Sequence, residues 1–173
     1  MTEASSMHTG QHLTRHDVVV AARAWLGTPY HHQASRRSIG TDCVGLVRGV
    51  WQDLYGKEAE SAGAYTRDWA EATGQETLLA AARRHLIEID PAIIQPGDVA
   101  VFRYRTRMLA KHTGIIASSL WPRADACGTP RDVDRGSLTL IHATEGTPAC
   151  EVALLPWWRR RIAAAFAFPG LID

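Results

Sequence analysis

Three residues that can do chemistry together stand far apart in this chain: one cysteine, Cys43, and two histidines, His112 and His142. A thiolate is a strong nucleophile, and a neutral imidazole can take the proton from a thiol. A second imidazole can hold the first in the required tautomer, although it is a weaker anchor than a carboxylate. The three residue types therefore indicate a nucleophile, a base and a residue that orients the base.

Cys43 stands at the start of a predicted amphipathic helix. The apolar residues that follow recur at helical spacing: Leu46, Val47, Val50, Trp51 and Leu54. Thr41 or Asp42 can cap the first turn, and Gly56 ends the helix after Tyr55. Unpaired N–H groups and the helix dipole favour an anion there, so we expect the pKa of the Cys43 thiol to be lowered. An ordinary buried cysteine heading a core helix would show the same local pattern.

The two histidines lie in the half of the chain that alternates in polarity. From Pro96 onward this alternation predicts five strands, over residues 98–104, 113–118, 138–144, 149–155 and 161–168. His112 opens the second of these strands and His142 lies in the third. Adjacent antiparallel strands place facing residues about 5 Å apart. We therefore expect His112 to face the thiol and His142 to lie behind it.

The first half of the chain is predicted to be helical. Thr14 and Asp17 form a capping-box-like start to a helix over residues 17–26, and Thr73 with Glu76 precedes a helix over 75–86. The segment 87–94 reads as a connector broken by proline. Helices followed by a strand meander predict an α+β fold.

The domain organisation is predicted to be simple. Residues 1–13 read as an N-terminal arm and residues 14–173 as a single domain, since no linker or repeat interrupts them. The segment 119–137 is rich in Pro, Gly, Asp and Arg, which predicts a long loop, and Cys127 within it is interpreted as incidental.

Composition limits the class of partner. Apolar residues make up 46% of the 173, and the net charge of +1 predicts no direct nucleic-acid binding, so the arginine pairs and triplet are interpreted as local features. Three cysteines, odd in number and far apart, form no disulfide framework. The polar start predicts no signal peptide, and no stretch reaches the roughly 18 apolar residues of a spanning helix. We expect something other than a leader to deliver the protein if it acts outside a cell.

Histidine spacing raises the alternative of a metal site. His8, His12 and His16 are spaced by four, but Gly10 and Thr14 argue against one helix through all three. Cysteine with two histidines is also a possible zinc ligand set, and spacing alone does not decide between a zinc site and a nucleophile. We predict no metal and no cofactor. His31 and His32, in the polar loop 31–40, are interpreted as solvated.

Five motifs in order resemble those of the NlpC-type cell-wall peptidases, which are papain-like cysteine peptidases. The motifs are Gly27-Thr28-Pro29-Tyr30, Asp42-Cys43-x-Gly45-Leu46-Val47, Pro96-Gly97-Asp98-Val99-x-Val101-Phe102, His112-x-Gly114-Ile115 and Ile141-His142-Ala143. The similarity runs from about Leu13 to the C-terminus. It implies a papain-like NlpC-type fold in which N-terminal helices pack on a central antiparallel sheet of about five strands.

The resemblance also implies an activity and a site. It implies a peptidase that cleaves peptidoglycan stem peptides, often between D-glutamate and a diamino acid. Cys43 would be the nucleophile, His112 the base and His142 the orienting residue. Tyr30 would line the site and help the Cys43 N–H to bind the oxyanion, and Asp42 would meet the amino end of the substrate.

The chain departs from the family pattern in three places. Val44 stands where the family usually has a serine that can help hold the substrate's amino terminus. The segment 31–33 (His-His-Gln) replaces a frequent Trp-Gly-Gly, and the 119–137 loop lengthens the gap between the two histidines.

Two features are most similar to the peptidases encoded with phage tails and gene-transfer agents. They are the Asp-Cys-Val-Gly-Leu-Val form at 42–47 and the segment from Trp157 to Pro169. This implies a protein made in the bacterial cytoplasm, assembled with tail-tip or baseplate hub proteins, and delivered to the target wall by the particle. Trp157 and Trp158 themselves are interpreted as core and rim of the last strands.

Two further alternatives stay open at this point. One is a structural tail protein that keeps the fold and has little activity. The other is a relative that transfers acyl groups or hydrolyses amides and esters, because such enzymes share the nucleophile.

Overall fold

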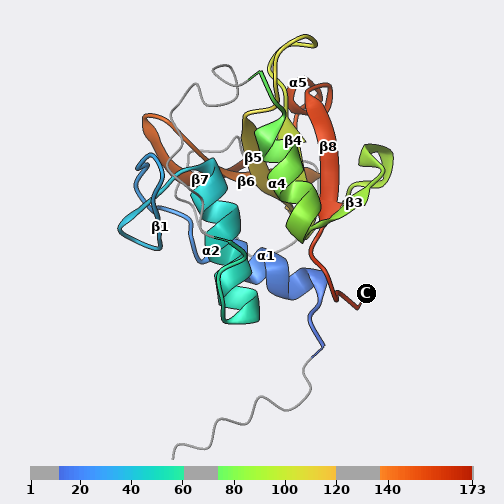
Figure 1. Cartoon of the computed structure of the whole chain (residues 1–173). Coiled ribbons are helices and arrows are strands. Elements are labelled where there is room, and N and C mark those ends of the chain that lie inside the picture. The colour runs from blue at the N-terminus through green and yellow to red at the C-terminus, as the bar shows by residue number, and fades with distance from the viewer. Residues whose placement is uncertain (1–11, 61–73, 120–136, 173) are drawn as a thin grey trace, which may run out of the picture.

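A six-stranded antiparallel sheet is the centre of the computed structural model, which describes residues 12–60, 74–119 and 137–172 (Figure 1). Its strand order is β3-β8-β4-β5-β6-β7. The strands are β3 (Ile87–Ile89), β4 (Val99–Phe102), β5 (His112–Ser118), β6 (Leu138–Thr144), β7 (Thr147–Ala153) and β8 (Ile162–Ala167). The remaining elements are α1 (Arg15–Arg23), the short pair β1 (Ser35–Arg36) and β2 (Gly40–Thr41), α2 (Cys43–Tyr55), α4 (Thr77–His85), the 3-10 turn η1 (Pro91–Ile93) and α5 (Pro156–Arg159). The α+β prediction is confirmed.

Helix α2 has the predicted bounds, because both of its ends carry local stop signals. The Asp42 carboxylate accepts the Gly45 N–H at 2.8 Å, and Gly56 ends the helix with a left-handed φ of 69°. The predicted capping box of Thr14 and Asp17 is present on α1. That helix spans Arg15–Arg23 rather than 17–26, and turns follow it.

Two predictions on the middle of the chain need correction. The sheet has six strands rather than about five, because Ile87–Ile89 pairs with β8 instead of forming a plain connector. Three residues before a proline are too few for alternation to reveal a strand. Helix α4 begins at Thr77 with Glu76 as its cap residue, and Thr73 lies outside the described residues. The Glu76 carboxylate accepts the Ala110 N–H at 2.9 Å, a long-range contact, instead of bonding its own helix.

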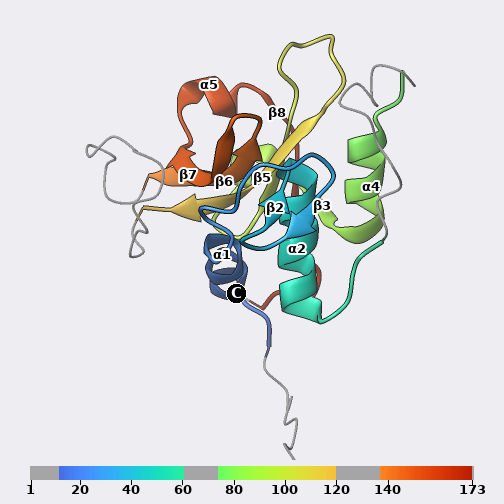
Figure 2. The ribbon, with the colours of Figure 1, turned by 90° about the vertical axis from the view of Figure 1, so that its left-hand side faces the viewer.

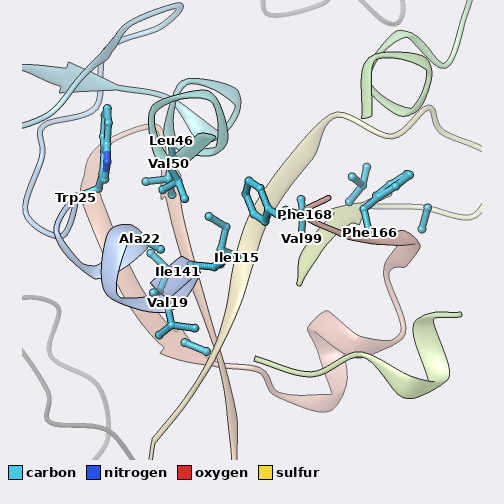
Figure 3. Packing of buried hydrophobic residues seen from close by; sticks show 14 of the residues in the cluster. Val19, Ala22, Trp25, Leu46, Val50, Val99, Ile115, Ile141, Phe166 and Phe168 are labelled. Carbon is cyan, nitrogen blue, oxygen red and sulfur yellow. The ribbon is translucent and has the colours of Figure 1, made fainter. Parts of the chain in front are cut away.

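Helices α1 and α2 lie side by side on one face of the sheet (Figure 2). Figure 3 shows Val19 and Ala22 of α1 and Leu46 and Val50 of α2 pointing toward Ile115 of the sheet. All five side chains are fully buried, and each larger one contributes about 1.5–3 kcal/mol. We call this side of the sheet the helix face.

The opposite face holds a second, smaller cluster that includes Phe102, Ile116 and Leu140, with Trp158 packed against it. Strand β4 is therefore buried on both faces. Residues alternate between faces along a strand, so His112 lies on the same face as Ile116. We call this side the histidine face.

The described ends of the chain meet. Leu13, the last residue of the expected arm, forms a parallel bridge with Leu171, and its carbonyl accepts the Ile172 N–H at 2.9 Å. Among the helices in the described ranges, none combines the length and the apolar character needed to cross a bilayer.

Candidate active site

The loop before α2 fixes the position of Cys43. The Ala34 carbonyl accepts the Asp42 N–H at 3.3 Å, and the Ser35 hydroxyl donates to the Gly45 carbonyl at 2.7 Å. A Cβ on Gly45 would lie 1.8 Å from the Ala34 oxygen, so only glycine permits this approach. The glycine two residues after the cysteine is thus explained by backbone packing.

Asp42 is buried and hydrogen-bonds to both α2 and the loop that precedes it. One carboxylate oxygen accepts the Gly45 N–H, and the other accepts the Gln33 N–H at 2.7 Å. The His32 Nδ1 lies 3.5 Å from the second oxygen. His32 is therefore partly buried beside a carboxylate rather than a solvated loop residue, whereas His31 is exposed as expected.

His112 and His142 contact each other directly. The Nε2 of His112 lies 3.0 Å from the Nδ1 of His142, and each residue is only 4% exposed. Gly114 lies close to the next strand: a Cβ there would come within 2.7 Å of the Ile141 oxygen and 3.1 Å of the His142 Cβ. Glycine at this position therefore permits the close approach of β5 to β6 beside His142.

This contact restricts the tautomers of the pair. When the Nε2 of His112 donates, its Nδ1 keeps a lone pair and can accept a proton from a thiol. When the Nδ1 of His142 donates instead, the Nδ1 of His112 carries a proton and cannot act as a base. The pair is therefore competent as base and orienting residue in the first tautomer.

Aromatic rings enclose the pair. The Trp158 ring stacks on His112 at 5.6 Å between centroids and meets His142 edge-on at 5.2 Å. Tyr104 stacks on His112 at 6.0 Å, and Phe102 lies 5.9 Å from it. Burial lowers the pKa of His112 to about 3, with a smaller contribution from His142, and lowers the pKa of His142 to about 4. Both imidazoles are therefore neutral at pH 7.

Cys43 is partly buried, and its sulfur lies against the backbone amide of Thr113, the residue after His112. This amide, with those of Val44 and Cys43 itself, lowers the pKa of the thiol. Burial and the Asp42 charge outweigh them and raise the pKa to about 12. The expected lowering is therefore wrong for the resting protein.

No family model and no curated protein matches the chain, but solved structures do. The NlpC/p60 domain of the peptidoglycan hydrolase SagA is 16% identical with a TM-score of 0.58, over 90% of this chain and all of that one. An NlpC/p60 family protein from Bacillus cereus is 15% identical with a TM-score of 0.58 over 91% of this chain. A lipoprotein-like NLP/P60 family protein from Staphylococcus aureus is 16% identical with a TM-score of 0.53 over the whole chain. The chain has the NlpC/p60 fold.

This chain spans 46% of the Staphylococcus aureus chain and 41% of the Bacillus cereus chain. The NlpC/p60 fold therefore accounts for only part of those two proteins. At these identities the similarity establishes the fold, and the chemistry has to be argued from the residues themselves.

Two tyrosines, Tyr30 and Tyr104, lie near Cys43 in this structure. Tyr30 bridges to Thr41, just before Cys43. Burial raises the pKa of Tyr104, and the nearby Cys43 and Tyr30 raise it further, so the two tyrosines and the thiol share one region. The sequence analysis singled out Tyr30 but not Tyr104, although Tyr104 is an aromatic residue two positions beyond Phe102 at the end of a strand.

The alternative of a metal site receives no support from the described ranges. Among residues 12–60, 74–119 and 137–172, no group of three or more His, Cys, Asp or Glu side chains could hold an ion. The ring nitrogens of His112 and His142 that face each other share a hydrogen bond. His8, Cys127 and nearly all of the 119–137 loop lie outside the described residues.

Proposed function

We propose that this protein is a cysteine peptidase that hydrolyses peptide bonds in peptidoglycan stem peptides. The observation that carries the proposal is the buried His112–His142 hydrogen bond beside the strand residue whose amide contacts the Cys43 sulfur. The NlpC/p60 fold, which the chain shares with a domain of the peptidoglycan hydrolase SagA, supports the class of substrate.

The catalytic cycle follows from the protonation states. His112 accepts the Cys43 proton through Nδ1, and the sulfur attacks the carbonyl carbon of the scissile bond. The oxyanion accepts the Cys43 N–H, with the Tyr30 hydroxyl as a second donor. The His112 imidazolium, held by His142, then protonates the leaving amine, and water hydrolyses the thioester.

The finer points rest on the sequence resemblance. The bond cleaved is the one between D-glutamate and a diamino acid, and Asp42 meets the amino end of the peptide. The protein is made in the bacterial cytoplasm and assembles with tail-tip or baseplate hub proteins of a phage-like particle. The particle delivers it to the wall of the target cell, which it opens for DNA entry.

Digestion of purified peptidoglycan and of one defined muropeptide, with the products identified by mass spectrometry, tests the proposal. Wild-type protein releases stem-peptide fragments, Cys43→Ala releases none, and Cys127→Ala is the matched cysteine control that keeps activity. Activity should also survive treatment with a chelator. A Cys43→Ala variant as active as the wild type would refute the nucleophile assignment.

A further inference from the structure

Two segments meet beside the histidine pair, at the end of the sheet where α5 lies (Figure 1). They are the β4–β5 connection, residues 103–111, and the segment 156–161, and we call them together the basic rim. The Arg161 Nε donates to the Tyr104 carbonyl at 3.2 Å, and its Nη1 donates to the Trp157 carbonyl at 3.0 Å. These contacts join the two segments.

The basic rim concentrates positive charge. It holds seven of the 19 Lys and Arg residues of the chain and contains no Asp or Glu: Arg103, Arg105, Arg107, Lys111, Arg159, Arg160 and Arg161. Glu76 comes in from outside and pairs with Arg103. By contrast, the Arg83–Arg84 run on α4 pairs with Glu88 and Glu60 at 2.9 and 2.6 Å. The basic rim therefore presents a positive field, which attracts anions.

An aromatic path connects this charge to the candidate catalytic residues. Trp157 is 43% exposed, and the Arg161 guanidinium carbon lies 3.9 Å from its ring centroid. Trp157 meets Trp158 edge-on at 4.8 Å between centroids, and Trp158 contacts both histidines. A ligand that lies on Trp157 is thus one ring away from the base.

We propose that the basic rim binds a carboxylate of the substrate, with Arg161 as the paired cation and Trp157 as the apolar surface beneath the adjacent peptide. The inference rests on the proposed function, in which a stem peptide containing D-glutamate lies across the site. Arginine is the side chain best suited to pair with a carboxylate, and an indole covers neighbouring apolar groups at little entropic cost. The basic rim thereby selects peptides whose carboxylates are free over peptides in which they are amidated.

The test compares kcat and KM for one stem peptide in its free-carboxylate form and in its fully amidated form. Wild-type protein should have a KM about tenfold lower for the free carboxylate, and this preference should shrink as salt is raised. Arg161→Gln should lose the preference through KM with little change in kcat. Because Arg161 also braces α5, the exposed pair Arg159→Gln/Arg160→Gln serves as a second variant, with an expected loss of about threefold. Arg83→Gln/Arg84→Gln, with the same change of charge on α4, is the matched control and should keep the preference.

Equal KM values for the two peptides, or an unchanged preference in both rim variants, would overturn the inference. If the wild type cleaves neither peptide, the proposed function fails, and equilibrium dialysis of the same two peptides still tests the basic rim. Binding that prefers the free carboxylate and is lost in Arg161→Gln then supports it. A short DNA duplex bound more tightly than the peptide at equal salt, and released by the same variants, would assign the rim to nucleic acid and overturn the proposal.

Discussion

Both faces of the sheet bury apolar side chains, but the histidine face also buries two imidazoles. On the helix face, Val19, Leu46 and Ile115 are fully buried among other apolar groups. On the histidine face, two imidazoles that are each 4% exposed lie on the same side as the buried Phe102 and Ile116 and hydrogen-bond to each other. Burial of apolar groups stabilises the fold, whereas burial of titratable groups costs stability and holds them neutral. Packing on the helix face should therefore contribute to stability alone, whereas the two imidazoles of the histidine face should determine reactivity.

The largest expected effect is a loss of activity when the histidine face is changed at His112. His112→Ala removes the base, so kcat/KM on a defined muropeptide should fall about a thousandfold, within the usual range for general-base loss. Because His112 is enclosed by aromatic rings and hydrogen-bonds to His142, its loss should also lower the melting temperature, so kcat/KM is measured at a temperature where the variant is folded. A variant that keeps full activity would show that another group takes the thiol proton.

The next effect is the pH dependence of stability. The pKa values of His112 and His142 are lowered in the folded state from 6.5 to about 3 and about 4, so the unfolded chain binds more protons between pH 4 and 6.5. The free energy of unfolding should therefore fall as the pH drops through that window, by about 2 kcal/mol per histidine at pH 5 relative to pH 8.

Denaturant unfolding at both pH values measures this loss, and the His112→Ala/His142→Ala double variant is the control, in which most of the dependence should vanish. The exposed carboxylates with lowered pKa values, such as Glu60 and Glu88, lose their ion pairs only at lower pH. An equally steep profile in the double variant would show that the two histidines are not the groups that titrate.

The difference between the faces also explains what could be predicted from the sequence. The bounds of α2 follow from Asp42 and Gly56, and those of β6 from alternation, since these signals are local. The proximity of the two histidines was likewise expected from their places on adjacent strands. The enclosure by Tyr104 and Trp158 was not, because it depends on how the β4–β5 connection and α5 fold over the histidine face.

The pKa of Cys43 shows the same limit of sequence reasoning. The helix N-terminus is visible in the sequence, and its amides do lower the pKa as expected. Burial of the thiol and the charge of Asp42 act in the opposite direction and are larger. How deeply a side chain is buried depends on segments remote in the chain, which no local pattern encodes.

A smaller effect tests the helix face alone. Val50→Ala removes part of a fully buried side chain two turns along α2 from Cys43, and should cost about 2 kcal/mol of unfolding free energy. At temperatures where the variant is folded, kcat/KM should stay within about threefold of the wild type. Denaturant unfolding and the muropeptide assay measure the two quantities. A large loss of activity in folded Val50→Ala would mean that packing on the helix face tunes the site.

The smallest expected effect is a shift in the pH dependence of kcat/KM, which compares Trp158 on the histidine face with Trp51 on the helix face. Trp158→Leu opens the enclosure to water, so the pKa values of both histidines should rise toward 6.5 and the acid limb of kcat/KM should move up by about one pH unit. Trp158→Phe keeps an aromatic ring and should move it less. Trp51, which packs against Tyr55 and Phe168 on the helix face, provides the control. Trp51→Leu should lower the melting temperature and leave the acid limb in place. An equal shift of the acid limb in Trp158→Leu and Trp51→Leu would contradict this prediction. It would mean that loosening of the whole fold, rather than loss of the Trp158 ring, changes the pKa of His112.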